Sequence, residues 1–353
     1  MAESKWETKI TKVVPDNLLI SGYPLQDLVE RKTLLDVAHL LVSGELPDVR
    51  NREILRKTAL QAVMLPAPPV TRNPNEDISK SLAKCFLLDE ELVTYPDRPT
   101  KKTAFVLGRT ARYLAKLYGT EQSLSGLTGD EDFSTILYLV FIGKPQVNEK
   151  QSRLLEAMVT ACVDHGVTPP SAQATIIASS VRASYEVCIA QGIGAITDVH
   201  GGAGTKAALF FKECAMSSSD MKSIIEDHNR QKKRIPGLGH RIHKNDPRRD
   251  VLWKLAIESG MAGQMVGFSR NISADFREIT GKDLPINVDG VIGAIVADFC
   301  LDVSAAKAIF IFGRVAGLSA HHYEELSMPQ MRQINFAEAV YSGKGARVVP
   351  GKA

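Results

Sequence analysis

Three of the eight histidines stand beside residues that form turns: His165 in VDHGVTPPS, His200 in DVHGGAG and His240 in GLGHR. A histidine at a helix end or glycine turn can face a cleft, and its ring exchanges protons near neutral pH. A carboxylate, Asp289 in NVDG, stands at the start of an expected helix. This set favours acid–base chemistry with Asp289 as a general base. The alternative is structural, with packing histidines and an Asp that caps its helix.

The stretch RIPGLGHRIHKNDPRRD, residues 234–250, combines glycines, histidines and cations. Glycine lets the backbone approach a ligand closely. Basic residues concentrate at 231–249 while the formal net charge is only +3, which favours a small anionic ligand over nucleic acid. GGAGTK at 201–206 resembles a phosphate loop superficially, but its Gly-Thr-Lys order lacks the required Gly-Lys-Ser/Thr. An NTP-binding enzyme is therefore disfavoured.

The histidine and cysteine spacings argue against a metal site. No H-x-x-x-H or H-E-x-x-H unit occurs, and the five cysteines form no C-x-x-C pair. We therefore expect no metal and a reducing, cytoplasmic compartment. Cys162 lies three residues before His165, which could suggest a thiolate nucleophile, but an apolar setting favours a buried, inert thiol.

Helical periodicity dominates the elements that must position these groups. TLLDVAHLLVSGELP begins with Thr33 and Asp36 in a capping-box arrangement and stops at Gly44, a complete helix signature. Alternating strand patterns are scarce, so the sequence predicts a mainly α protein. Further helices, with interruptions, are expected over 103–118, 135–142, 151–164, 171–191, 203–216, 249–259 and 290–325.

Size and composition indicate a globular protein. At 353 residues, with 44% apolar and 24% charged residues, the chain suggests two closely apposed domains with a ligand cleft between them. The start lacks the pattern of a signal peptide, and the apolar stretch 136–142 is far shorter than the ~20 residues of a membrane helix. We therefore expect no membrane association. Gly313 and Gly317 have small-xxx-small spacing, which predicts close helix packing in a soluble core or interface.

Five motifs, in this order and at these intervals, resemble the citrate synthase superfamily: DHG at 164–166, HGGA at 200–203, PGLGHRIHKNDPR at 236–248, NVDG at 287–290 and GRVAG at 313–317. The resemblance implies a citrate synthase fold and a homodimer. It also implies a large helical domain, 1–203 with 304–353, and a small domain, 204–303, that contributes CoA-binding and catalytic residues.

The resemblance implies a role for each motif residue. Asp289 is expected to remove a proton from the acyl-CoA α-carbon, His200 to hold the thioester oxygen as it becomes an enolate, and His240 to polarise the carbonyl of a 2-oxo acid. Residues expected to hold carboxylates are His165, Arg248 and Arg314. Residues expected to contact coenzyme A are Ile235, Pro236, Gly237, Leu238, Gly239, Arg241 and Lys244. The CoA thioester would be a substrate, with no tightly bound cofactor.

Departures from the synthase pattern bear on the reaction. Arg248 follows His240 by eight positions, one fewer than is usual, and Ser21 stands where synthases commonly have arginine. The usual arginine near the C-terminus is missing from INFAEAVYSG, with Arg332 the nearest candidate.

Two motifs, VDHGVTPPSAQATIIAS and INVDGVIGAIVADF, are most similar to citryl-CoA lyase and the C-terminal lyase module of ATP-citrate lyase. We therefore favour cleavage of citryl-CoA to acetyl-CoA and oxaloacetate. Citrate or 2-methylcitrate synthase is the close alternative, supported by His200. A silent CoA-binding scaffold is disfavoured because the acid and both histidines are present.

Overall fold

The structure, a computed structural model, describes residues 6–73, 75–217, 220–239 and 243–331. Within these ranges it contains sixteen α-helices and three short strands, which confirms the mainly α prediction. The helices are α1 (Leu25–Arg31), α2 (Leu34–Ser43), α3 (Val49–Met64), α4 (Ile78–Leu87), α5 (Glu90–Thr94), α6 (Pro99–Tyr118), α7 (Phe133–Ile142), α8 (Glu149–Thr160), α9 (Pro170–Ser180), α10 (Tyr185–Gly194), α11 (Ala203–Met216), α12 (Met221–Arg230), α13 (Arg248–Glu258), α14 (Gln264–Thr280), α15 (Val288–Asp298) and α16 (Ser304–Leu326).

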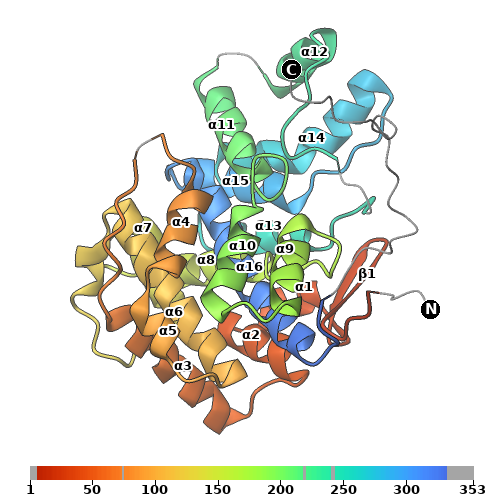
Figure 1. Cartoon of the computed structure of the whole chain (residues 1–353). Coiled ribbons are helices and arrows are strands. Elements are labelled where there is room, and N and C mark those ends of the chain that lie inside the picture. The colour runs from red at the N-terminus through yellow and green to blue at the C-terminus, as the bar shows by residue number, and fades with distance from the viewer. Residues whose placement is uncertain (1–5, 74, 218–219, 240–242, 332–353) are drawn as a thin grey trace, which may run out of the picture.

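The strands form an antiparallel sheet in the order β1 (Thr11–Val14), β2 (Asn17–Ile20) and β3 (Tyr23–Pro24). A two-residue turn joins β1 to β2, and its second residue, Asp16, has a φ of 56°. In Figure 1 this hairpin stands at the right of the helical body, beside α1.

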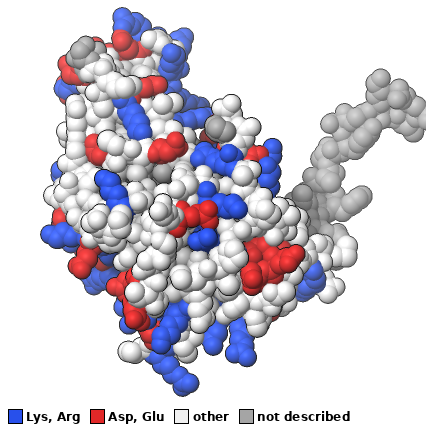
Figure 2. All heavy atoms as spheres, turned by 90° about the vertical axis from the view of Figure 1, so that its left-hand side faces the viewer, with Lys and Arg blue, Asp and Glu red and all other residues white. Residues whose placement is uncertain are grey.

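The helices gather into two regions in Figure 1. Helices α11, α12, α14 and α15 lie at the top, and α2, α3, α5 and α6 lie at the bottom. The upper helices come from within the predicted small domain, 204–303, apart from the first residue of α11. The exact division into 204–303 and 1–203 with 304–353 stays a prediction. Figure 2 shows Lys and Arg interspersed with Asp and Glu over one face of the molecule.

Helix α2 has the ends that its sequence predicts. Thr33 and Asp36 form a capping box, and Gly44 ends the helix in the left-handed region at φ 81°. These contacts satisfy backbone groups that a helix end otherwise leaves without partners.

Helix α16 packs closely on the C-terminal end of α8 through two glycines. A Cβ atom on Gly313 would lie 2.1 Å from the Val159 carbonyl oxygen, and one on Gly317 would lie 2.3 Å from that of Val163. Neither position therefore has room for a side chain. The predicted small-residue packing is confirmed, and it holds Arg314 against the end of α8.

Two expected helices are each divided in the structure. The expected 171–191 helix becomes α9 and α10, separated near Arg182, and the expected 290–325 helix becomes α15 and α16, separated near Cys300. Arg182 has φ 60° and Cys300 has φ 56°, and this left-handed conformation interrupts a right-handed helix. No helix in the described ranges is both long enough and apolar enough to span a membrane.

Candidate active site

The turn after α8 carries His165 and is held by the buried carboxylate of Asp164. One oxygen of Asp164 accepts the Gly166 N–H at 2.9 Å, and the other lies 3.0 Å from His321 Nε2. Burial opposes ionisation of Asp164, but His321 and Arg314 outweigh it and hold the pKa of this carboxyl well below its usual range. The His165 turn is therefore tied to α16 by an ionised carboxylate.

Arg314 projects from α16 toward the same turn and is buried. Its Nε donates to the Cys162 carbonyl oxygen at 3.2 Å. Its Nη1 is buried and has no hydrogen-bond partner among the described residues. A buried guanidinium N–H without an acceptor is costly, so this atom is well suited to bind an anionic group of a ligand. The role of Arg314 in binding carboxylate stays a prediction.

Arg248, the first residue of α13, is also buried and already has an internal carboxylate partner. Its Nε and Nη2 donate to the two oxygens of Asp246 at 2.9 and 2.8 Å, and its Nη1 donates to the Ala161 carbonyl oxygen at 3.1 Å. Asp246 also accepts the Val288 N–H at 3.0 Å. Sequence motifs did not reveal that Asp246 would join Arg248 to the start of α15.

Asp289 lies half-buried in the first turn of α15. Burial, and to a smaller extent the nearby Asp246, raise its pKa against the opposing charges of Arg248 and Arg314, with a net result of about 6. The capping alternative is wrong, because Asn287 is the N-cap and accepts the Gly290 N–H at 3.1 Å. Because Asn287 caps the helix, the Asp289 carboxylate is not needed as a cap. Its raised pKa makes it a stronger base than an ordinary aspartate.

His200 lies on the tight turn before α11. Its Nε2 is 2.8 Å from Ser171 Oγ and accepts the Ser171 N–H at 3.4 Å. Accepting at Nε2 favours the neutral ring with its proton on Nδ1. The first turn of α11, which follows the His200 turn, meets α15, because a Cβ atom on Gly204 would lie 3.6 Å from the Asp289 carbonyl oxygen. The structure thus places the helix after His200 against the helix that carries Asp289.

The remaining predicted histidines are placed less completely. The His165 ring lies edge-on to the His243 ring, with centroids 5.7 Å apart. His240 and Arg241 lie outside the described residues, so their predicted roles stay predictions.

The loop 235–239 is joined to the start of α15. The Asn287 backbone N–H donates to the Gly237 carbonyl oxygen at 3.0 Å, and its side-chain Nδ2 donates to that of Gly239 at 2.8 Å. A Cβ atom on Gly237, where φ is 80°, would lie 2.4 Å from the Gly290 Cα. Only glycine allows the two backbones to approach this closely. Asn287 therefore supports both the loop and the helix that carries Asp289.

A cavity of about 600 Å³ lies beside this loop, between the end of α12, α14 and the segment before α15. Three residues predicted to contact coenzyme A line it: Ile235, Leu238 and Gly239. The contact with coenzyme A stays a prediction. Other lining residues were not individually predicted: Asn229, Lys232, Lys233, Arg234, Phe276, Lys282 and Leu284.

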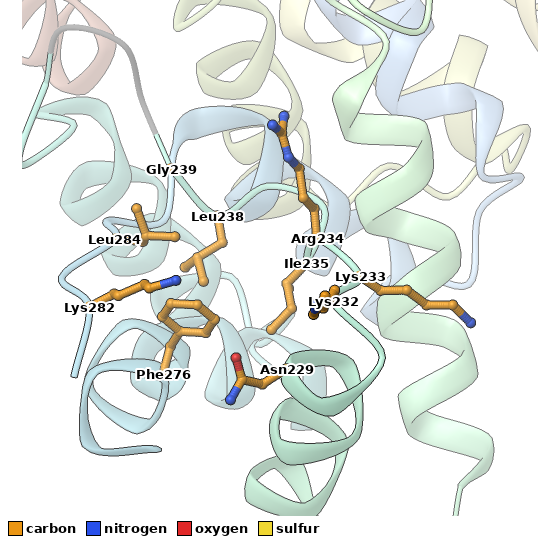
Figure 3. A pocket seen from close by; sticks show the side chains of 10 residues that line it. All are labelled: Asn229, Lys232, Lys233, Arg234, Ile235, Leu238, Gly239, Phe276, Lys282 and Leu284. Carbon is orange, nitrogen blue, oxygen red and sulfur yellow. The ribbon is translucent and has the colours of Figure 1, made fainter. Parts of the chain in front are cut away.

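Figure 3 shows Lys282 extending inward over the Phe276 ring, whereas Lys233 extends away from the group. The concentration of basic residues at 231–249 predicted an anionic ligand, but Lys282 comes from a separate segment. Lys244, predicted to bind phosphate, is exposed and is not among the residues that line this cavity. A cavity with an aromatic wall and cations at its edge suits a ligand with both a flat ring and phosphate groups.

Residues 4–334 match the family profile described as "Citrate synthase, C-terminal domain". The chain belongs to the citrate synthase family. The citrate synthase of Heyndrickxia coagulans is 25% identical, with 90% of this chain and 89% of the relative covered. The solved citryl-CoA lyase of Hydrogenobacter thermophilus is 26% identical with a TM-score of 0.55, covering 98% of this chain and 97% of that one. Citrate synthase from Thermotoga maritima shares the fold, at 21% identity and a TM-score of 0.80, with 99% and 96% covered.

Membership confirms the superfamily and the fold expected from the five motifs. Enzymes of the citrate synthase family form or cleave carbon–carbon bonds, with acyl-CoA and oxaloacetate as family substrates. The chain is therefore an enzyme of this class.

Proposed function

We propose that this protein forms or cleaves the bond between the α-carbon of an acyl-CoA and the carbonyl carbon of a 2-oxo acid, at a site built from Asp289, His200 and Arg314. One observation supports this most directly: a half-buried carboxylate with its pKa raised to about 6 lies within electrostatic reach of two buried arginines. A base of this kind suits a carbon acid, and the arginines suit the carboxylates of the partner substrate.

In the forming direction, Asp289 takes the proton from the acyl-CoA α-carbon. The developing negative charge moves to the thioester oxygen, where His200 donates a hydrogen bond from Nδ1. Such a donor typically contributes ~3–4 kcal/mol to transition-state stabilisation. The enolate carbon then attacks the 2-oxo acid carbonyl carbon. The family resemblance assigns His240 to polarising that carbonyl, and the alkoxide oxygen that forms takes up a proton. Cleavage reverses these steps.

Two contacts would hold the substrates. A carboxylate of the oxo acid would accept from Arg314 Nη1, with His165 and Arg248 nearby. The CoA moiety would follow the loop 235–239 into the cavity of about 600 Å³, where Lys282 and its neighbouring cations would meet phosphate. Closure of the site around both substrates would exclude water from the enolate.

Two overall reactions use this step, and a different observation favours each. Similarity to a solved citryl-CoA lyase over nearly the whole chain favours citryl-CoA cleavage. The synthase names of the curated relatives, including one at 25% identity, favour citrate or 2-methylcitrate synthesis, which adds hydrolysis of the thioester. When the product is citrate, citryl-CoA is the intermediate of the synthesis, and it is also the substrate of the cleavage reaction.

The test supplies each substrate pair to the purified protein. Acetyl-CoA or propionyl-CoA with oxaloacetate should release free CoA thiol if the protein is a synthase. Citryl-CoA should give oxaloacetate and acetyl-CoA without thiol release if it is a lyase. Inactivity in both assays, across several acyl-CoAs and 2-oxo acids, would reject these substrates and favour a CoA-binding scaffold. Light scattering on the same preparation tests the proposed homodimer.

A further inference from the structure

The tip of the β1–β2 hairpin holds a segment more than 200 residues away in the sequence. The Asp16 backbone N–H donates to His243 Nδ1 at 2.9 Å, and Asp16 Oδ1 accepts the Asn245 backbone N–H at 2.8 Å. One residue thus supplies both a donor and an acceptor to residues 243–245. His243 is buried at this contact, whereas Asp16 and Asn245 are exposed.

The same hairpin contacts the turn that carries His165. The Val13 side chain lies against Gly166, since a Cβ atom there would be 3.3 Å from Val13 Cγ2. The Thr11 backbone carbonyl oxygen would lie 3.6 Å from the same Cβ atom. The hairpin therefore touches both segments whose histidine rings meet, the 164–166 turn and the 243–245 segment.

Residues 243–245 directly precede the segment that supplies Asp246 and Arg248, so their contact with the hairpin affects the position of that segment. Asp246 follows at once, and it binds the Arg248 guanidinium through both carboxylate oxygens. Fixing residues 243–245 therefore fixes the start of the segment that supplies Asp246 and Arg248. The ring of His243 also packs against the ring of His165.

From these contacts we propose that Asp16 is a positioning residue for the 2-oxo acid side of the active site, acting by docking residues 243–245 on the hairpin. The assignment rests on the proposed function for its kinetic effect. The docking itself depends only on the two hydrogen bonds.

The backbone conformation and the hydrogen bonds of Asp16 determine which variants test the proposal. Its φ of 56° is tolerated by Asn and Gly but strained for Ala, so D16A would mix two effects. Its side chain accepts from an uncharged backbone N–H, which an amide oxygen can also do. D16N therefore preserves the docking acceptor, and D16G removes it without backbone strain. K12Q, an exposed change on the same hairpin, is the matched control.

Steady-state kinetics with the substrate pair that the wild type turns over provide the first test. We expect D16G to raise KM for the 2-oxo acid about fivefold, the typical net effect of one hydrogen bond. KM for acyl-CoA should stay within twofold, with Tm matching D16N, and both D16N and K12Q should resemble the wild type. No difference between D16G and D16N would overturn the proposal. So would equal rises in both KM values with a lower Tm, which indicate a general structural defect.

Hydrogen–deuterium exchange of the substrate-free protein provides a readout that needs no activity. Peptides that contain Asn245 should exchange faster in D16G than in the wild type, D16N or K12Q. Unchanged exchange would overturn the docking even in an active enzyme. If every substrate pair fails while this exchange responds, the proposed function fails and the kinetic role of Asp16 falls with it, but the docking stands.

Discussion

Arg248 and Arg314 donate to consecutive backbone carbonyls, those of Ala161 and Cys162, just beyond the end of α8. The last carbonyls of a helix carry partial negative charge, so this is a favourable place for cations. Arg248 lies in α13 and Arg314 lies in α16, and both donate hydrogen bonds to the same two-residue segment. Asp246 is hydrogen-bonded to Arg248, while Arg314 Nη1 has no hydrogen-bond partner among the described residues.

Asp289→Asn should abolish most of the reaction in either direction. The amide keeps the shape of the side chain but cannot accept the proton, and general-base catalysis is typically worth about 10²- to 10⁴-fold in rate. Turnover is measured with saturating substrates, and circular dichroism and Tm check the fold. A variant that retains more than a tenth of wild-type turnover would contradict the role of Asp289 as base.

The forming reaction should slow in acid because Asp289 must be ionised to act as a base. Its pKa, raised by burial to about 6, predicts that kcat falls about tenfold per pH unit well below that value. Asp164 and Asp246, whose pKa values are held low, stay ionised across this range. The measurement is kcat from pH 5 to 8. A profile that is flat down to pH 5 would count against the raised pKa.

Arg314→Gln should weaken binding of the oxo acid because it removes the buried Nη1–H. A hydrogen bond to a charged group contributes ~1.5–3 kcal/mol, so KM for the oxo acid should rise about 10- to 100-fold. Arg314→Lys keeps the charge without the two-pronged geometry and should fall between Gln and wild type. KM for acyl-CoA serves as the internal control. Equal rises in both KM values would indicate a loss of fold instead.

Asn287→Asp separates the two tasks of this residue. Aspartate can still cap α15 at the Gly290 N–H, but it cannot donate to the Gly239 carbonyl oxygen. We expect KM for acyl-CoA to rise several-fold with a change in unfolding free energy below ~1 kcal/mol. Asn287→Ala should lose the cap as well, at ~1 kcal/mol of stability. Urea unfolding and kinetics on both variants test this, and identical behaviour would refute the separation.

His322 should make the fold sensitive to acid. Its ring is buried, with Nδ1 2.9 Å from Ser179 Oγ, and burial lowers its pKa to about 4. The unfolded chain therefore binds the proton first, so the stability from neutral His322 is complete above pH ~6.5 and declines as the pH falls to about 4.

The corresponding test is His322→Gln, which can still contact Ser179 and does not titrate. Between pH 6.5 and 5 the wild type should lose ~2 kcal/mol more unfolding free energy than the variant. Urea unfolding at both pH values measures the difference. Equal pH slopes in the two proteins would show that His322 is not the responsible group.

Sequence patterns predicted the fold where local signals were complete. Helix α2 has a capping box and a terminal glycine, so both of its ends were predictable. Helices α1, α3, α4, α5, α12 and α14 were not predicted. In α12 and α14 few residues are buried, which leaves only a narrow apolar stripe: Met221 and Ile225 in α12, and Met265, Val266 and Ile272 in α14. The breaks at Arg182 and Cys300 lack the glycine that usually marks a left-handed residue.

In the candidate site, too, residues in local sequence motifs were predictable, whereas contacts between distant chain segments were not. Motifs identified Asp289, His200 and Arg314 because their neighbouring sequences are distinctive. They gave no sign of Asn287 donating to Gly239, or of the Asp16 contact with Asn245, because both depend on chain segments meeting in three dimensions.

The contact of Gly237 with Gly290 limits how mutations can alter the substrate preference of this enzyme. Because no side chain separates the two backbones, the loop proposed to lie along CoA and the helix that bears Asp289 form one mechanical unit. A shift of the loop to fit a different thioester would carry the carboxylate with it. We therefore expect acyl-group preference and proton abstraction to be coupled, so that mutations that broaden the first slow the second.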